Sequence, residues 1–551
     1  MTKANVANWS NYPEVTSDPY ARSLKACKSL REYNFYIMTI CVLMQLVING
    51  DLTNTACVLA VYFASLITVG TVIRASAFRL AALPSLIVVG FNVATLSGAL
   101  VAQTLSLNSL TDGLKVPEYT FPALILFQIG LLIALTCFIN IGIFSRISKI
   151  INSIVFVPLG LMRSPFPLQV WIMGGIGLTA MVLSIDFNQS VKFGDASAKF
   201  IPGFSYLAFA PFLLPALPYI FPNDEKYVSI KSSYKFLLPY FVILIVVGIS
   251  ANTRGGFAGP ITNLCLVMLV LFLLGQFVLT KMARKLLMAG AAVFILGSSI
   301  ISDVAIAMLV VRSERDHSTA VQLISKTFDA FQNKKELKAY LKYQDNIADL
   351  SDYDEKYISN PFIGRLVVTK FTDNMLSLRV VREGQRVDFI WDITRQTLIS
   401  LFPTPMLRFF GSNLDKENLR FSIGDVLYAA QYGTDIGINN YKLGSSVAHG
   451  FALMGVISYL VVIPMFLFTF IAAHSLTLLK DNMIIMSPVI LMQLIALYYI
   501  SAGDSYFAPV FFLFRTFPQN ILIYLLAFYF SRLIASFIIF IFNPEQRLAR
   551  Y

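Results

Sequence analysis

The sequence predicts an all-α polytopic membrane protein with about twelve transmembrane helices and one large helical loop domain outside the cytoplasm. Apolar side chains make up 56% of the 551 residues and charged side chains only 13%. Many windows of about 20 residues could cross a bilayer, and the alternating pattern of a membrane β-barrel is absent. Residues 312–447 stand apart, because they hold 18 Lys/Arg and 17 Asp/Glu, nearly half of all charged side chains.

The predicted elements divide the chain into five parts. Residues 1–32 are predicted to form a cytoplasmic tail. Because this segment starts with polar residues, a cleaved signal peptide is not expected there. Nine spans fall in 33–311, the loop domain in 312–447, three spans in 448–542, and a second cytoplasmic tail in 543–551. The spans are predicted at 33–47, 54–73, 80–103, 121–144, 169–187, 201–221, 236–251, 258–280, 286–311, 448–472, 483–503, and either 506–530 or 519–542. Within the loop domain, Val321, Ile324, Phe328 and Phe331 have the spacing of an amphipathic helix over 318–343.

Charge sets the predicted orientation. Residues 151–162 are apolar but too short to cross, so we interpret them as an interfacial or re-entrant piece; counting them as a span would invert everything after them. Lys and Arg then concentrate in the short inside loops, which predicts that both termini are cytoplasmic. The same bias accounts for the net charge of +12, so no nucleic-acid partner is implied.

Arg254 is the first candidate functional residue. It lies in the short loop Asn252-Thr-Arg-Gly-Gly, between two predicted spans on the side where cations are scarce. The glycines let backbone approach a ligand closely, and the helix that follows begins with free N–H groups that favour an anion. A forked guanidinium there suits a diphosphate; the alternative is an interfacial arginine that contacts lipid headgroups.

Further cations gather in the second half of the loop domain: Arg379, Arg382, Arg386, Arg395 and Arg408. The first three are spaced to share one face of a helix if Gly384 permits a helix there. This row either binds an anionic ligand or forms ordinary ion pairs with the nearby acids Glu383, Asp388 and Asp392.

Two candidates lie near the outer ends of the last spans. His449 follows the loop domain directly, where a histidine can hold or relay a proton near neutral pH; the alternative is a capping or headgroup-facing histidine. Arg515 is a charge inside an apolar run, and such residues are functional candidates by default. Because no metal-ligand spacing, Walker motif or glycine-rich nucleotide loop occurs, we expect no metal, no cofactor and no nucleotide-sugar chemistry.

These features resemble an oligosaccharide repeat-unit polymerase of the Wzy type, in the O-antigen polymerase/ligase family, with a GT-C-like architecture. The resemblance covers the topology, with one large outside loop before the last few spans. Asn252-Thr-Arg-Gly-Gly is similar to the family's Ser/Thr-Arg-Gly at a span start, and Phe402-Pro-Thr-Pro405 to a proline-containing stretch midway in its loop. Residues 444–459, with His449 and Gly455, are similar to the segment after that loop. In the related ligases this segment continues with Asn and a Glu-containing stretch, whereas here it continues Gly-Phe-Ala-Leu-Met.

The resemblance implies a metal-independent glycosyltransferase of a bacterial inner membrane, which polymerises polyprenyl-diphosphate-linked repeat units into O-antigen, capsule or exopolysaccharide. The implied partners are a lipid-linked donor and acceptor, membrane lipids and, as an open alternative, a chain-length regulator protein. His449 would be the base, with Asp388 or Asp435 as a fallback, and Trp391 would stack on glycan. The implied diphosphate ligands are Arg254, Arg379, Arg382, Arg386, Arg408 and Arg515. The rivals are a ligase that transfers finished glycan and a flippase for lipid-linked oligosaccharide.

Overall fold

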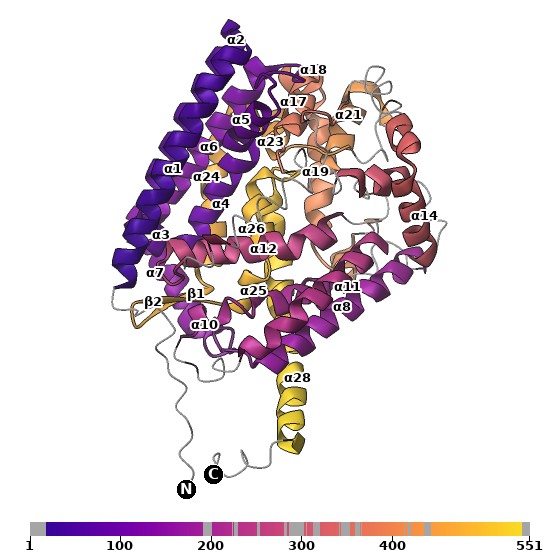
Figure 1. The fold of residues 1–551 in the computed structure, drawn as a ribbon. Helices are drawn as coiled ribbons and strands as arrows, with labels where there is room; N and C mark the ends of the chain where they lie inside the picture. The colour runs from indigo at the N-terminus through magenta and orange to yellow at the C-terminus, as the bar shows by residue number, and fades with distance from the viewer. Residues whose placement is uncertain are drawn as a thin grey trace.

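The computed structural model describes most of the chain, with gaps. The described residues are 18–190, 201–222, 224, 230–250, 254–279, 284–285, 302–304, 306–311, 320–340, 342, 353–358, 364, 366–412, 414–416, 419, 421–434 and 442–542. Helices dominate these segments. α1 (Pro19–Ile48) begins and α28 (Phe517–Phe542) ends at one end of the molecule, whereas α17 (Thr369–Ser377) and α21 (Ile423–Tyr432) lie at the opposite end, which we call the loop end (Figure 1).

Six helical segments among the described residues are long and apolar enough to cross a bilayer, so the chain is a multi-pass membrane protein. They are α2 (Leu52–Val72); α4 (Ala82–Asn92) continued by η2 (Val93–Ser97) and α5 (Gly98–Leu105); α6 (Pro117–Asn140); α8 (Pro167–Ser190); α23 (Ser446–Met454) continued by η9 (Gly455–Ile457) and α24 (Ser458–His474); and α27 (Ala508–Phe511) continued by η11 (Phe512–Thr516) and α28. α11 (Leu237–Ser250) and α12 (Arg254–Leu273) contribute shorter apolar stretches. A total of about twelve spans stays a prediction.

The core of the bundle is aromatic. α1, α2, α4, α6 and α24 run side by side (Figure 1). Where α4, α6 and α24 meet, the ring of Phe127 stacks on Phe91 at 4.9 Å and meets the edge of Phe466 at 6.4 Å. All three rings are buried, and such pairs add specific geometry to apolar packing.

A β-hairpin replaces the start of the span predicted at 483–503. β1 (Thr477–Lys480) pairs antiparallel with β2 (Met483–Met486), and the two turn residues, Asp481 and Asn482, have φ of +50° and +58°. Asp and Asn tolerate this conformation, which two-residue hairpin turns require. The rest of the predicted span is α25 (Pro488–Leu491), α26 (Leu494–Tyr499) and η10 (Ile500–Ala502). The prediction of one continuous helix over 483–503 is therefore wrong, whereas the described residues as a whole are largely helical, as predicted.

The predicted span at 201–221 is also not a regular helix. It consists mainly of η4 (Ser205–Leu213), a 3-10 helix, and the four-residue α10 (Leu217–Ile220). Prolines at 202, 211, 215 and 218 each remove a backbone donor and disfavour a continuous α-helix.

The first half of the short apolar stretch 151–162 continues a helix that starts earlier, and residues 157–162 form turns. α7 (Gly142–Ile151) runs into the π-helical turn η3 (Asn152–Phe156). Its inner face is polar: Ser148 Oγ donates to Ile471 O at 3.2 Å, and Asn152 Nδ2 donates to Ser475 O at 2.6 Å. Ile143, Ile147, Ile150 and Ile154 are exposed, which suits a helix lying against lipid. Its length is too short to cross, in agreement with the interfacial interpretation.

α14 (Ala320–Gln332) confirms the helix predicted within 318–343. Leu323 and Ala330 pack against Ile306 and Val311, and Phe331 of the predicted apolar stripe packs against the same cluster. Phe328 is exposed, so the buried face coincides only in part with the predicted stripe.

α8 approaches η4 at Gly177 closely enough to be tested by mutation. A Cβ at Gly177 would lie 2.0 Å from Ala208 N, whereas a Cβ at Gly175 would meet nothing within 4 Å. Small residues allow helices in membranes to approach in this way. We expect Gly177→Val to reduce the yield of monodisperse protein severalfold in size-exclusion chromatography and Gly175→Val to leave it unchanged. Equal yields would contradict this packing.

Candidate functional site

α17 inserts polar loop residues among the membrane helices. All but one of its nine residues are buried, although most are polar. Val368 N donates to Ala94 O at 2.9 Å, and Thr369 Oγ1 donates to Thr95 O at 2.6 Å. Both carbonyls belong to η2, where the π-helical turn disturbs regular hydrogen bonding. The loop domain is thus fastened to an irregular point of a span.

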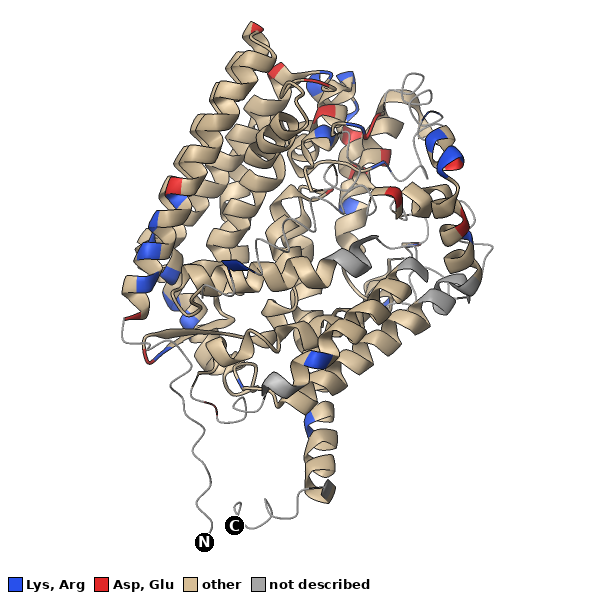
Figure 2. Cartoon of the chain, viewed as in Figure 1, with Lys and Arg blue, Asp and Glu red and all other residues tan. Residues whose placement is uncertain are grey.

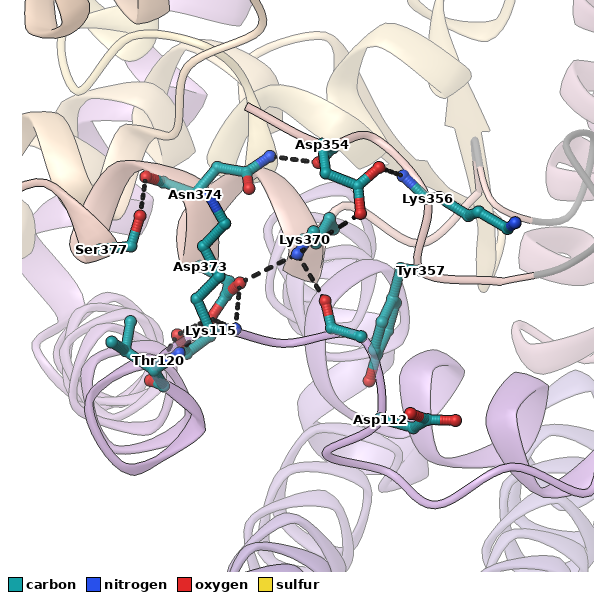
Figure 3. Close-up of polar contacts among 12 residues, drawn as sticks. Asp112, Lys115, Thr120, Asp354, Lys356, Tyr357, Lys370, Asp373, Asn374 and Ser377 are labelled. Atoms are coloured by element: carbon teal, nitrogen blue, oxygen red, sulfur yellow. Dashed lines mark hydrogen bonds and ion pairs between the residues drawn. The ribbon is translucent and has the colours of Figure 1, made fainter. Parts of the chain in front are cut away.

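Asp373 of α17 is the centre of a polar network at the loop end (Figure 3). Its carboxylate accepts hydrogen bonds from Lys115 N at 2.8 Å, Val116 N at 2.9 Å and Thr120 Oγ1 at 3.2 Å. These donors surround the N-terminus of α6, where free N–H groups and the helix dipole favour an anion. Lys370 Nζ lies 3.2 Å from the same carboxylate.

The Lys370 side chain is buried nearly as completely as the Asp373 side chain. The Lys370 and Asp373 side chains are 3% and 0% exposed. Lys370 also donates to Gly113 O, and its Nζ lies 4.0 Å from Asp354 Oδ2 (Figure 3). Because both charges are compensated within the protein, we assign this network to the attachment of the loop domain rather than to ligand binding.

Asp504 holds the segment that leads into α23. Its carboxylate accepts from Ile423 N, the first residue of α21, at 2.9 Å and from Gly444 N at 2.5 Å. Burial raises the pKa of Asp504 above its ordinary value, while these N–H groups oppose the rise. Asp504 therefore ties α21 and the start of α23 to the end of η10.

His449 is fully buried between α19 (Val387–Ile399) and the segment before α27. Tyr506 N donates to Nδ1 at 3.2 Å, and Nε2 lies 3.1 Å from Thr394 Oγ1. Because Nδ1 accepts, the neutral ring carries its proton on Nε2 and donates it to Thr394. Thr394 Oγ1 in turn donates to Ile390 O at 2.7 Å. Both ring nitrogens are engaged, so no lone pair is available to a substrate hydroxyl in this arrangement.

Trp391 packs α19 against α23. Its Nε1 donates to Leu453 O at 3.1 Å, and its ring lies 6.3 Å from Phe507. The side chain is half-buried. Stacking of Trp391 on glycan stays a prediction.

The arginine row predicted at 379–386 does not share one helical face. α18 (Arg379–Arg382) is a single turn, and Gly384 and Arg386 follow with φ of +64° and +50° before α19 begins. Left-handed backbone ends a helix, so the prediction of one face is wrong. All three arginines are exposed, and the Arg382 guanidinium lies 5.6 Å from the ring centre of Tyr119.

The remaining predicted residues are separated. Asp388 is exposed in the first turn of α19, and Arg408 is exposed on α20 (Thr404–Phe409). Arg254, predicted in a loop just before a span, is instead the first residue of α12, which starts four residues earlier than the predicted span. The Arg254 side chain and all of Asp435 lie outside the described residues.

The positive charge of Arg515 acts on Lys416, a residue that the sequence did not single out. Arg515 lies on η11, near the start of the last candidate span, and is partly buried. Lys416 is buried, and its Nζ donates to Ser400 O at 3.0 Å and Phe402 O at 2.6 Å. Burial, and then the charge of Arg515, lower the pKa of Lys416. We call Lys416 and Arg515 the cation pair.

The cation pair has no acidic partner in the described part of the chain. Neither residue forms an ion pair with a described carboxylate. Two like charges in a partly buried place repel each other and lose hydration, so a bound anion would stabilise them. Across the same described segments, no three His, Cys, Asp or Glu side chains gather in a way that could hold a metal ion.

Comparison with known proteins gives no relative for this chain. No family model, no curated protein and no solved structure matches it.

Proposed function

We propose that the protein polymerises polyprenyl-diphosphate-linked oligosaccharide repeat units by glycosyl transfer outside the cytoplasm of a bacterium. The cation pair carries the proposal, because Lys416 of the loop domain is buried without a carboxylate partner among the described residues and the charge of Arg515 in the last candidate span acts on it. A lipid-diphosphate leaving group gains negative charge as the glycosidic bond breaks, and fixed cations at the membrane surface stabilise that charge. The bond between sugar and lipid diphosphate in the donor already supplies the free energy for transfer, so a nucleotide-binding site is not needed.

The distribution of charge supports the proposed orientation. Lys and Arg residues outnumber Asp and Glu around the start of α1, α3 (Ala75–Leu80) and the β-hairpin, whereas at the loop end the two kinds of charge are mixed (Figure 2). Under the positive-inside rule this end faces the cytoplasm. The loop domain then stands outside, where a polymerase of this type would meet lipid-linked repeat units.

Distances along α19 limit the choice of base. Lys416 binds the carbonyl of Ser400, just beyond the end of α19, whereas Asp388 lies in its first turn. A helix of 13 residues is about 20 Å long, so Asp388 is too far from the cation pair to act on the same bond. Because both nitrogens of His449 are engaged, we assign His449 to positioning α19. Of the three predicted bases, Asp435 therefore stays as the candidate for the general base.

An assay of purified protein tests the proposal. The protein in detergent receives a lipid-diphosphate-linked repeat unit, with no nucleotide sugar, and products are separated on a gel. A ladder of products supports a polymerase. A single transfer to a lipid A core or protein acceptor without a ladder would identify a ligase. Movement of labelled lipid-linked glycan across reconstituted vesicles, again without a ladder, would identify a flippase.

Arg254→Ala should abolish the ladder while leaving membrane insertion normal. A guanidinium at the start of α12 can bind a diphosphate with two parallel hydrogen bonds. Arg254→Lys should recover little product, because an ammonium does not replace the fork. Product yield is measured against the amount of protein in the membrane fraction. A wild-type ladder from Arg254→Ala would exclude the predicted diphosphate role.

A further inference from the structure

The loop between η3 and α8 is fixed against α28 by hydrogen bonds from two side chains. Tyr529 Oη of α28 donates to Leu159 O at 2.9 Å, and Gln169 Nε2 of α8 donates to Phe528 O at 2.7 Å. Gln169 is buried, and its Oε1 accepts from Phe166 N at 3.1 Å. The two ends of the loop are therefore held on neighbouring residues of α28.

An arginine from each side meets at this contact. The Arg532 guanidinium of α28 lies 5.6 Å from the ring centre of Phe166 in the loop. Gly160 has φ of +79°, and a Cβ there would lie 2.8 Å from Tyr529 Oη and 3.2 Å from Arg163 Nε. Arg163 and Tyr529 therefore approach the same point of the loop, while Arg532 contacts its last part.

No carboxylate neutralises these two arginines among the residues that the structure describes. Neither Arg163 nor Arg532 forms an ion pair there. Residues 142–185 and 517–542 contain no Asp or Glu at all. Arg532 also lies inside the last candidate span, where a cation without a counter-charge is costly.

The contact lies at a membrane boundary and is bordered by apolar side chains. Ser487 Oγ, just after β2, donates to Leu161 O at 2.7 Å, which places the loop at the end of the molecule that carries the β-hairpin (Figure 1). The candidate span of α8 begins directly after the loop, at Pro167. Phe530 and Leu533, on either side of Arg532 in α28, are exposed.

We propose that Arg163 and Arg532 bind the phosphate of an acidic phospholipid, whose acyl chains lie along Phe530 and Leu533. Its negative charge compensates two cations that the described protein leaves without a carboxylate, and basic sites between spans are suited to acidic headgroups. The exposed apolar side chains favour a lipid over a free anion. The inference does not depend on the proposed polymerase activity.

Site-specific photocrosslinking tests the lipid site. p-Benzoylphenylalanine replaces Leu533 in full-length protein reconstituted into phosphatidylcholine vesicles that contain a small fraction of radiolabelled phosphatidylglycerol. The reference position is Phe63, which is exposed on α2, a helix without Lys or Arg. We expect labelling at position 533 to exceed labelling at position 63 about tenfold, the order expected for two cations acting on an acidic lipid.

Arginine variants show whether this excess comes from the proposed site. Arg163→Gln combined with Arg532→Gln should remove the excess at position 533. The matched control is Arg74→Gln, which removes an exposed arginine just before α3, at the same end of the molecule, and it should leave the excess unchanged. An equal loss in the control would mean that general positive charge attracts the lipid.

The other outcomes also overturn the inference. Equal labelling at positions 533 and 63 would show only bulk lipid around α28. The same excess with radiolabelled phosphatidylcholine would show that the headgroup is not selected, and an excess that persists in the double variant would show that the arginines do not bind it. A larger excess with a radiolabelled isoprenyl phosphate would assign the site to a substrate lipid. The comparison of lipids uses the natural arginines, so it decides the question even where the double variant fails to fold.

Discussion

Replacing Asp373 by alanine is expected to lower the free energy of unfolding by about 3–5 kcal/mol, the range for removing one partner of a buried ion pair. The change leaves the Lys370 ammonium, whose side chain is 3% exposed, without its nearest counter-charge. It also removes the acceptor of Lys115 N, Val116 N and Thr120 Oγ1 at the start of α6. Unsatisfied buried donors add to the loss. The loop domain should therefore detach from the spans at lower denaturant concentration.

Unfolding in detergent micelles, followed by the fluorescence of the three tryptophans, measures this effect. The matched control is Asp392→Ala, which removes an ion pair with Arg395 that has the same i,i+3 spacing but side chains 51% and 72% exposed. Exposed pairs contribute only about 0–1 kcal/mol. A similar loss of unfolding free energy in both variants would mean that the Asp373 network is no more buried than a surface ion pair.

The apolar pattern of the sequence was sufficient for the class and for six of the twelve predicted spans, all of which overlap candidate spans of the structure. Residues 54–73, 121–144 and 448–472 were predicted as spans and overlap α2, α6 and the α23–α24 segment. The hairpin was missed because Met483–Met486 is as apolar as a span start, and a short apolar run cannot be assigned to helix or strand by periodicity alone. Its signal was the Asp481-Asn482 pair, which suits a tight turn.

The candidate site was less predictable because its key contacts join distant parts of the chain. Lys416 lies between Asp415 and Glu417, which is typical of a solvated loop. Only the fold buries it and exposes it to the charge of Arg515. Lys370 and Asp373 have the spacing of an ordinary surface pair, yet α17 is inserted among the spans. His449 was correctly singled out as unusual, but sequence alone could not reveal that Thr394 and Tyr506 occupy both of its nitrogens.

Arg515→Ala is expected to slow polymerisation about 100- to 1,000-fold, the loss typical of removing one preorganised group that stabilises transition-state charge. Arg515 is the cleaner member of the cation pair to change, because Lys416 also binds the carbonyls of Ser400 and Phe402. Arg515→Ala should leave folding intact, since it relieves repulsion with Lys416. The initial rate of ladder formation at saturating lipid-linked donor measures the effect.

Two further variants make the Arg515 result specific. Arg515→Lys should recover part of the rate, because it restores the charge without the forked donors. Arg395→Ala removes an exposed arginine that already pairs with Asp392 at 3.0 Å, and it should leave the rate unchanged. If Arg395→Ala slowed the reaction as much as Arg515→Ala, general positive charge on the loop domain would explain the effect. A wild-type rate in Arg515→Ala would instead show that the cation pair takes no part in the reaction. If it did take part, loss of a fixed positive charge near the leaving diphosphate would lower the rate.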